Sequence, residues 1–516
     1  MTEMKTKPTR PLKASEVARW DRQTDVAVVG FGGAGACAAI EAHDAGARVT
    51  IFELASAAGG STALSSAEIY MGGGEGTRVQ QACGWHDSDR DMFEYLKASA
   101  GPQADDAKIR AYVAGSAEHF NWLVDKGVPF KDSEYRQRAM MALTDDCLLF
   151  TGSEKAWPFA QLAKPCPRGH NLEVEGDNGG PLFMQIMSDN VSQRGIEVEF
   201  NARALTLIVD DHSGRVCGLV VRIDMQEHFV KVNKGVVLCN GGFAMNEPML
   251  KKYAPGLMRC SMPIGNPGDT GTGILMGLGV GAAAINMHEG FVSLPFYPPA
   301  SLTYGVLINA QGQRFINEDC YHGRVGAYVL RQQGDRVYLV FGYEDYGDYE
   351  QNSYLGASVA GTGETLAELE TELGLPAGQL QHSVEFYNRH AEQGQDPLFH
   401  KASEWLKPIC APYVALDCTP GRGAYFPYFT LGGLDTLPSG EVLTADGDII
   451  AGLYAAGRTA CGIPRRGEGY ASGLSVGDAT FSGRMAGLAA AGAGGTGDAE
   501  PKPANPDYEH DQQRKP

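Results

Sequence analysis

Near the N-terminus, two apolar segments flank a segment of small residues in the pattern of a β-α-β unit. Residues 24–30, TDVAVVG, form a short run rich in β-branched side chains, which is typical of a strand buried on both faces of a parallel sheet. Residues 35–46 are rich in alanine with helical spacing, and residues 48–53, RVTIFE, form a second run typical of a strand. Together these segments have the length of a β-α-β unit, about 30 residues.

A glycine-rich turn joins the first predicted strand to the helix. Gly30, Gly32 and Gly35 have GxGxxG spacing. The first glycine permits a tight turn, the second lets a pyrophosphate approach the main chain, and the third lets the helix pack on the strand. Glu53 ends the second strand, 18 residues after Gly35, where a carboxylate binds ribose hydroxyls. The alternative is a structural turn with a solvated glutamate, but the context favours a dinucleotide site.

A second block rich in glycine and serine follows the acidic residue, at residues 58–62 and 65–74. Such a block suits an extended FAD, because its backbone and hydroxyl donors can reach the pyrophosphate and the flavin. Its composition also fits a flexible surface loop. The full set of predicted cofactor contacts comes from both ends of the chain: Gly30, Gly32, Gly33, Ala34, Gly35, Glu53, Gly60, Ser61, Thr62, Ala204, Asn240, Gly241, Asp269, Gly457, Arg458, Gly473, Leu474 and Ser475.

The pattern of a strand followed by glycine recurs far along the chain. Residues 236–243 (VVLCNGGF) and 452–457 (GLYAAG) predict strands that end in glycine, while residues 268–273 (GDTGTG) and 469–478 (GYASGLSVGD) predict helix starts. Ligand-contacting loops of nucleotide-binding α/β folds lie at the carboxyl ends of strands. We therefore predict one interrupted domain, divided as follows: a polar arm at 1–22, the nucleotide-binding domain at 23–285 and 430–490, a middle region at 286–429, and a disordered tail at 491–516.

The amino-acid composition indicates which kinds of partner the protein binds and where in the cell it is found. The net charge of −19 argues against nucleic-acid binding, which depends on clustered Lys and Arg, and it favours a soluble particle. Apolar runs are short, so we expect no membrane insertion, and the basic start lacks an apolar core behind it, so we expect a cytoplasmic protein. The eleven cysteines include no CxxC, and no HExxH or Asp-rich loop occurs, so we predict no metal.

The motifs taken together resemble the flavoprotein family of fumarate reductases and 3-ketosteroid dehydrogenases. The matching pieces are VVGFGGAGA…FE, GGST, VVLCNGGF, GDTGTG, NAQGQRFINE at 309–318, TLGGL at 430–434 and GLYAAGR, and they span residues 24 to 490. The resemblance implies an α/β fold in which a Rossmann-like FAD-binding domain carries an inserted α+β capping domain, with substrate held between them. No histidine lies between Glu53 and Gly76, where respiratory relatives attach FAD, so we expect non-covalent FAD.

One departure from the fumarate reductases bears on the reaction. Their proton-donating arginine follows the RFxNE segment, but this chain has DCYHG at 319–323, with His322 near the arginine's position and Tyr321 beside it. The segment is similar instead to 3-ketosteroid Δ4-(5α)-dehydrogenases, in which a tyrosine of the cap works with a Tyr-x-Ser pair of the C-terminal flavin loop. That pair is Tyr470 and Ser472 here. The resemblance therefore implies that Tyr321, Tyr470 and Ser472 are catalytic.

The expected reaction removes hydrogen from C4 and C5 of a 5α-saturated 3-ketosteroid. Tyrosine and serine hydroxyls can hydrogen-bond the enolate oxygen and move a proton, although both are poor bases without assistance. Segments 291–299 and 424–429 are aromatic and suit a flat apolar ring system, or form plain domain core. With no haem motif, electrons pass to an external acceptor that the sequence does not name.

Two rival functions remain open at this stage. One is a flavin-dependent alkene reductase that acts on an unsaturated carboxylic acid, with Arg465 or Arg466 as the carboxylate anchor. The adjacent arginines are more often surface residues, and His170, another candidate proton donor, is more often structural. The second rival is a flavin-binding redox sensor without turnover.

Overall fold

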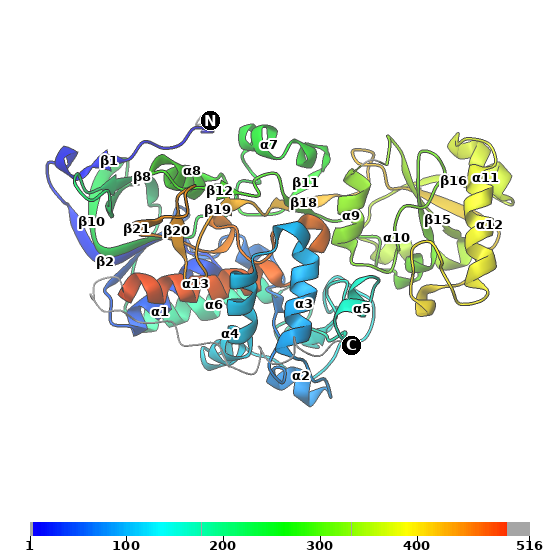
Figure 1. Ribbon diagram of the computed structural model, residues 1–516, viewed down its shortest axis with the longest axis horizontal. Helices are drawn as coiled ribbons and strands as arrows, with labels where there is room; N and C mark the ends of the chain where they lie inside the picture. Colours follow the sequence, from blue (N-terminus) through cyan, green and yellow to red (C-terminus); the bar gives the residue numbers. More distant parts are fainter. Residues whose placement is uncertain (1–3, 177, 332, 493–516) are drawn as a thin grey trace, which may run out of the picture.

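The larger part of the protein is built on a nine-stranded sheet (Figure 1). The computed structural model describes residues 4–176, 178–331 and 333–492. The strand order is β1-β8-β9-β10-β2-β3-β7, and β21 joins β10 and carries β20. The strands are β1 (Leu12–Lys13), β2 (Arg22–Val29), β3 (Val49–Phe52), β7 (Glu197–Glu199), β8 (Arg203–Val209), β9 (Val216–Ile223), β10 (Gln226–Leu238), β20 (Glu441–Leu443) and β21 (Ile449–Ala455).

Parallel pairing around β2 forms the nucleotide-binding half of this sheet. Strand β2 lies between β10 and β3, and β10 also pairs in parallel with β21. Residues 26–29 of β2 are buried, because other parts of the protein cover both faces of the sheet at this strand. The strands predicted at 24–30, 48–53, 236–243 and 452–457 are therefore confirmed, and their carboxyl ends meet at one edge of the sheet.

Helices α1 (Gly33–Asp44) and α13 (Leu474–Gly492) pack at unusually short range. A Cβ placed on Gly483 would lie 2.3 Å from the carbonyl oxygen of Ala34, and one on Gly487 would lie 2.2 Å from that of Ala38. Only glycine at these two positions of α13 lets the backbones approach so closely. The C-terminal helix thereby holds the first β-α-β unit in place, with α6 (Gly179–Gln193) alongside α1.

A mainly helical segment lies between β3 and β7. It contains α2 (Arg78–Ala82), α3 (Asp89–Ala100), α4 (Asp106–Asp125), α5 (Phe159–Leu162) and the small sheet β4-β6-β5, with β4 at Ile69–Tyr70, β5 at Leu148–Leu149 and β6 at Gly169–His170. The side chains of Ser88 and Asp105 cap α3 and α4 at their N-termini. A buried ion pair between Asp87 and Arg168 ties the helices to β6, with 2.6 Å between Oδ1 and Nη2.

The middle region forms a separate four-stranded antiparallel sheet, which lies at the right of Figure 1. Its order is β14-β15-β17-β16, with strands at Val306–Asn309, Val337–Gly342, Tyr413–Asp417 and Val359–Gly363, and its helices are α9 (His322–Leu330), α10 (Tyr349–Asn352), α11 (Leu366–Leu373) and α12 (Gln379–Ala391). Arg314 reaches both Glu318 and Asp396 inside this region. The QRFINE segment at residues 313–318 therefore has a structural role, since it fixes the chain that leads into α9.

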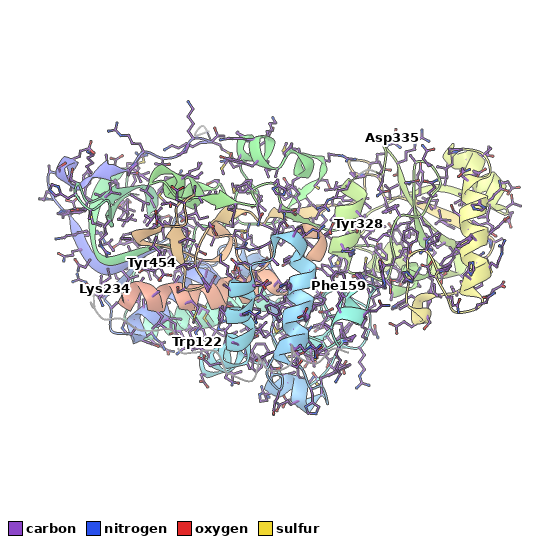
Figure 2. All side chains as sticks on the ribbon, in the orientation of Figure 1. Trp122, Phe159, Lys234, Tyr328, Asp335 and Tyr454 are labelled. Atoms are coloured by element: carbon purple, nitrogen blue, oxygen red, sulfur yellow. The ribbon has the colours of Figure 1, made fainter. Side chains whose placement is uncertain are left out.

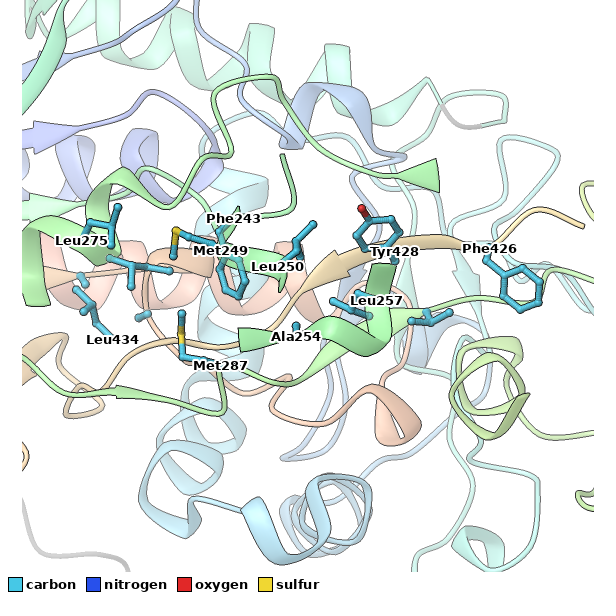
Figure 3. Close-up of a cluster of buried hydrophobic side chains, with 14 of the residues drawn as sticks. Phe243, Met249, Leu250, Ala254, Leu257, Leu275, Met287, Phe426, Tyr428 and Leu434 are labelled. Carbon is cyan, nitrogen blue, oxygen red and sulfur yellow. The ribbon is translucent and has the colours of Figure 1, made fainter. Parts of the chain in front are cut away.

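Short strands and a shared apolar cluster join the two parts. Strand β18 (Pro427–Thr430) pairs with β11 (Met262–Pro263) and β13 (Gly290–Val292), and β12 (Ala284–Ile285) pairs with β19 (Gly433–Leu434). The cluster drawn in Figure 3 comes from α7 (Glu247–Tyr253), α8 (Thr272–Gly279), these strands and the segments that connect them. It includes Phe243, Met249, Leu257, Met287, Phe426, Tyr428 and Leu434.

The N-terminal segment lies against the nucleotide-binding sheet. Strand β1 pairs in parallel with β8, and the amide of Thr9 donates to the carbonyl of Leu275 at 2.8 Å. At the other end, α13 continues to Gly492, and the rest of the tail predicted at 491–516 lies outside the described residues. Within the described ranges, every helix is too short or too polar to cross a bilayer.

Candidate active site

The glycine-rich turn has the geometry that its spacing predicts. Gly30 has φ +106°, and a Cβ there would lie 2.4 Å from the carbonyl oxygen of Cys239. A Cβ on Gly35 would lie 1.9 Å from the carbonyl oxygen of Gly30, so the helix packs directly on the strand end. At Gly32, by contrast, a Cβ would meet nothing closer than 3.7 Å. The first and third glycines are therefore required by the protein itself, whereas the second leaves the main chain open to a ligand.

Glu53 is buried at the end of β3, and backbone amides hold both of its carboxylate oxygens. The amide of Phe31 donates to Oε2 at 2.6 Å, and that of Ala55 donates to Oε1 at 2.7 Å. These bonds fix the carboxylate beside the glycine-rich turn, and each oxygen retains a lone pair for a ribose hydroxyl. Ala202 donates from its amide to the Glu53 carbonyl at 2.8 Å, which places the start of β8, including Ala204, near this acid.

Residues from four distant segments meet in front of the turn. Arg458 reaches Asp269 at 2.6 Å and donates to Ser61 Oγ at 2.8 Å. Thr62 Oγ1 accepts from the amide of Gly33 at 3.1 Å. A Cβ on Gly241 would lie 2.5 Å from Asp269 Oδ1. The structure thus brings together the predicted contacts from the glycine-rich turn, the 58–62 block, the end of β10, the start of α8 and the end of β21.

This cradle fits a dinucleotide. Gly32, the N-cap residue of α1, has no side chain to cap the helix, and Thr62 bonds the amide of Gly33, so the positive end of the helix dipole lies at the cradle. Among the described residues, the buried oxygens Oδ1 of Asn240 and Oδ1 of Asp269 have no hydrogen-bond partner. Buried acceptors of this kind are normally satisfied, and the hydroxyl and ring N–H groups of FAD would satisfy them. Gly473, Leu474 and Ser475 begin α13 nearby, where Gly473 O accepts from Tyr70 N at 3.1 Å.

The three predicted catalytic residues lie together although their segments are far apart. The Tyr321 hydroxyl and Ser472 Oγ are 2.6 Å apart, and the rings of Tyr321 and Tyr470 have centroids 6.4 Å apart. Tyr321 is the N-cap residue of α9 in the middle region, while Ser472 and Tyr470 precede α13. The site therefore lies where the middle region, the predicted inserted region at residues 286–429, meets the nucleotide-binding part.

One short loop, residues 151–154, holds both sides of this hydroxyl pair. Thr151 accepts from the amide of Ser472 through its carbonyl and donates from its hydroxyl to the Ser472 carbonyl, both at 2.9 Å. Ser153 Oγ accepts from the amide of Tyr321 at 3.0 Å. The loop belongs to the helical segment, so three parts of the protein must be in place before Tyr321 and Ser472 can meet.

Aromatic rings line the other side of the hydroxyl cluster. Phe291 and Phe429 are opposite each other on β13 and β18, with centroids 4.9 Å apart. The Tyr470 ring lies 4.5 Å from Phe291 and 5.5 Å from Phe429. Two rings of the predicted aromatic segments thus lie beside the hydroxyl cluster, whereas Phe296 and Phe426 of the same segments are packed in the core and Tyr425 is exposed. Phe159 and Tyr328 lie at the nearby junction (Figure 2), where the Arg324 guanidinium is 5.2 Å and 5.0 Å from their centroids.

Burial keeps the tyrosines protonated. It raises the pKa of Tyr470 to about 12 and holds the pKa of Tyr321 well above its ordinary value. Both residues therefore act as hydrogen-bond donors at neutral pH, and a phenolate base is disfavoured. Burial also lowers the pKa of His322 to about 3, so this histidine is uncharged at neutral pH. The position at which fumarate reductases have their proton-donating arginine is therefore neutral in this protein. Nδ1 of His322 bonds Ser293 Oγ at 2.5 Å.

The other polar candidates have protein partners. His170 bonds Thr77 and the Arg168 carbonyl at 2.8 Å and 2.9 Å, which confirms the structural interpretation. The expectation that both adjacent arginines are surface residues is wrong for Arg465, which is buried and reaches Asp105 at 2.9 Å. Arg466 pairs with Glu468. No group of three or more metal-ligating side chains occurs within the described parts of the chain.

Sequence reasoning missed several residues of this site. Thr151, Ser153 and Glu154 lie in a TGSE loop without periodic pattern, and Glu68 lies among small residues in the 65–74 block. Glu68 and Glu154 are both buried, at 3% and 1% exposure. A carboxylate in a loop usually faces water, so nothing in the sequence marks these two as interior.

The fold and the cradle identify the class of the protein. The family model described as "FAD binding domain" matches residues 25–469, so the chain belongs to this family. It is an FAD-dependent oxidoreductase of the flavoprotein group that contains fumarate reductases and 3-ketosteroid dehydrogenases, and the predicted α/β fold is confirmed.

Particular relatives refine this assignment. The chain is similar to the structure of 3-ketosteroid-Δ4-(5α)-dehydrogenase from Rhodococcus jostii RHA1 in complex with 4-androstene-3,17-dione, with 41% identity, a TM-score of 0.88, and coverage of 93% of this chain and 99% of that one. It is 28% identical over 480 residues to a fumarate reductase (cytochrome) of Shewanella frigidimarina, covering 90% and 77%. It is 25% identical over 508 residues to a 3-oxo-5-alpha-steroid 4-dehydrogenase of Comamonas testosteroni, covering 86% and 94%.

Proposed function

We propose that the protein oxidises a 5α-saturated 3-ketosteroid at C4 and C5, giving the Δ4-3-ketone. The observation that carries this proposal is the 2.6 Å contact between Tyr321 and Ser472, with Tyr470 and two phenylalanines beside it. A flat apolar ketone suits such a surface, because aromatic rings cover its rings and hydroxyls meet its oxygen. The similarity to the Rhodococcus enzyme supports the same substrate class.

The hydroxyl groups divide the work of the reaction. Tyr470 donates to the C3 carbonyl oxygen, together with a backbone N–H of the flavin loop, residues 469–478. These donors stabilise the negative charge that develops on the oxygen. Ser472, in contact with Tyr321, receives the proton that leaves C4. When bound, FAD supplies the two-electron acceptor for the hydride from C5. The loop at 151–154 keeps Ser472 and Tyr321 in register, which orients the proton transfer.

The two arginines suggested as the carboxylate anchor of the rival alkene reductase both have acidic partners within the protein. Arg465 is paired with Asp105, and Arg466 is paired with Glu468. A substrate carboxylate would have to compete with one of these acidic partners for its arginine. The similarity to the Shewanella enzyme keeps this rival worth testing.

An anaerobic titration tests the proposal. The purified flavoprotein is mixed with 5α-androstane-3,17-dione, and the flavin absorbance is recorded. Bleaching with formation of the enone supports the dehydrogenase. No bleaching, combined with reoxidation of chemically reduced enzyme by fumarate or an aryl acrylate, would establish the reductase instead.

A pair of tyrosine variants tests the site. Tyr470→Phe removes one charge-stabilising donor and is expected to lower kcat by about 10²–10³-fold, the usual effect of losing such a donor. Tyr343→Phe is the matched control, because Tyr343 is 62% exposed in the middle region, and it should retain wild-type turnover. Near-normal kcat in Tyr470→Phe with an intact flavin spectrum would remove Tyr470 from the mechanism.

A further inference from the structure

Two buried carboxyl groups lie behind Ser472. Glu68 directly precedes β4, and the amide of Tyr70 in this strand donates to the carbonyl of Gly473, the residue after Ser472. This bond holds β4 beside the segment that carries Ser472. The Glu68 carboxyl therefore lies against the Ser472 side chain. Oε1 of Glu68 has no hydrogen-bond partner in the described structure, and the charge of Glu154 acts on this carboxyl. An unpaired buried carboxyl is costly and calls for a function.

The surroundings of the two carboxyls differ. Glu154 accepts from the Tyr70 hydroxyl and from the amide of Gly152, both at 2.9 Å. Burial raises the pKa of Glu154, and these hydrogen bonds and the charge of Arg168 oppose that shift. Glu68 has neither an arginine nor a backbone amide, and the groups that face it are Ser472, Glu154, Tyr321 and Tyr470. Of the two, Glu68 is therefore the carboxyl that binds a proton more readily.

The proposed reaction requires a base that the hydroxyl groups do not supply. Ser472 is an alcohol, and burial holds the pKa of Tyr321 well above its ordinary value, so neither is ionised at neutral pH. A carboxylate behind the serine would remove this difficulty, as the base behind a serine does in other enzymes.

We propose that Glu68 takes, through Ser472, the proton that leaves C4 of the substrate, and that Glu68 and Glu154 form a carboxyl pair that holds it. The C4–H bond breaks and its proton goes to Ser472 Oγ, while the Ser472 hydroxyl proton goes to a carboxylate oxygen of Glu68. The C4–H electron pair becomes the C4=C5 bond, and FAD, when bound, would supply the oxidant that accepts the hydride from C5. This inference rests on the proposed function and adds the acceptor of the proton.

The proposed pair of Glu68 and Glu154 predicts how kcat depends on pH. Burial, followed by the charge of Glu154, raises the pKa of Glu68 well above its ordinary value, and the contact with Ser472 opposes this shift. Glu68 must be ionised to accept a proton, so kcat of the wild type should rise with pH through the ionisation of the pair. Glu68 acts through Ser472, so the profile distinguishes it from a residue with a purely structural role.

Three glutamine variants test the pair in the FAD-loaded enzyme. Glu68→Gln should lower kcat by about 10²-fold or more and abolish the rise with pH, since general bases contribute about 10²–10⁴-fold. Glu154→Gln removes the like charge and should shift the rise to lower pH. Glu370→Gln, at a buried glutamate of α11 far from the site, is the matched control and should leave the profile unchanged.

A second measurement does not depend on turnover. A carboxyl whose folded pKa is raised stabilises the fold below its unfolded pKa, and that contribution is lost as pH rises through the folded pKa. Glu68→Gln should therefore match the wild-type melting temperature near pH 4.5 and exceed it at pH 9. Equal melting temperatures at both pH values would show that Glu68 does not titrate as an unpaired carboxyl and would overturn the pair.

The outcomes separate this inference from the function on which it rests. A wild-type enzyme that does not oxidise the steroid refutes the proposed function. A wild-type enzyme that does so, together with a Glu68→Gln variant of unchanged kcat and unchanged pH profile, refutes only the role of Glu68. Loss of activity in Glu68→Gln with the pH-dependent rise preserved in shape would also refute it, since a merely structural effect lowers the profile without changing its form.

Discussion

A single methyl group on α13 should disturb the FAD site from a distance. We consider Gly483→Ala, because Gly483 lies in the middle of α13 against Ala34, the residue that follows Gly32 and Gly33 in the nucleotide turn. The added Cβ would lie 2.3 Å from Ala34 O and 3.0 Å from its C and Cα atoms. All three are backbone atoms, so no side-chain rotation relieves the contact. Ordinary contact requires the helices to separate by about 1 Å.

Two opposing terms set the size of the effect. Alanine in a helix interior gains about 1 kcal/mol over glycine. Overpacking of a close contact costs about 1–3 kcal/mol, and we take the upper end because both partners are backbone. The expected net loss of stability is therefore about 1–2 kcal/mol. The separation falls on the first turn of α1, so we also expect the FAD dissociation constant to rise about tenfold, which corresponds to about 1.4 kcal/mol.

The assay compares this variant with a matched substitution in the same helix. Gly492→Ala places a methyl group at the end of α13, where nothing lies within 4 Å, and it should leave both properties unchanged or slightly improved. Melting temperature is measured for both variants, and FAD affinity is measured by quenching of flavin fluorescence on binding. If Gly483→Ala retained the FAD affinity and melting temperature of Gly492→Ala, the claim that α13 positions the nucleotide turn would be wrong.

Two further substitutions test other parts of the site. Ser153→Ala removes the acceptor for the amide of Tyr321, and because an unsatisfied buried N–H costs about 1–3 kcal/mol, kcat for the steroid should fall roughly tenfold with the flavin spectrum unchanged. Steady-state kinetics check this, and unchanged kcat would mean that the loop does not position Tyr321. Asp87→Asn leaves Arg168 buried without its counter-charge and should cost about 3–5 kcal/mol at neutral pH. Burial opposes the ionisation of Asp87, but Arg168 outweighs it and lowers the pKa, so this stability is present above about pH 4 and is lost as pH falls through the folded pKa. Thermal unfolding at several pH values should therefore show a gap between the two proteins that narrows in acid, and a gap independent of pH would contradict the assignment.

The nucleotide-binding elements could be predicted from sequence because their signals are local. A run such as VAVV at residues 26–29 can be buried on both faces of a sheet, and the glycines at 30, 32 and 35 have spacing that only a tight strand-to-helix turn requires. The structure places β2 and α1 within two residues of the predicted bounds. Family resemblance supplied Tyr321, Tyr470 and Ser472, whose proximity no periodic pattern indicates.

The residues that sequence reasoning missed have contacts that are set only by tertiary structure. Ser153 has no pattern around it, and its hydroxyl matters because α9 begins beside it, 168 residues further along the chain. Glu68 lies in a loop of small residues, where a carboxylate usually faces water. Arg465 was expected at the surface because adjacent arginines are more often exposed, but α4 begins beside it and buries it against Asp105.

These contacts explain why the site needs the whole fold. Tyr321 comes from the inserted region, Ser472 and Tyr470 come from the last part of the chain, and the loop at 151–154 comes from the helical segment between β3 and β7. The hydroxyl pair forms only when the inserted region is seated on the nucleotide-binding part, and then Ser472 has Tyr321 on one side and Glu68 on the other. The assembled state is thus needed to bring Tyr321 to Ser472. Movement of the inserted region would separate Tyr321 from Ser472 but leave Glu68 beside it, because Glu68 and Ser472 are joined through β4 and the flavin loop.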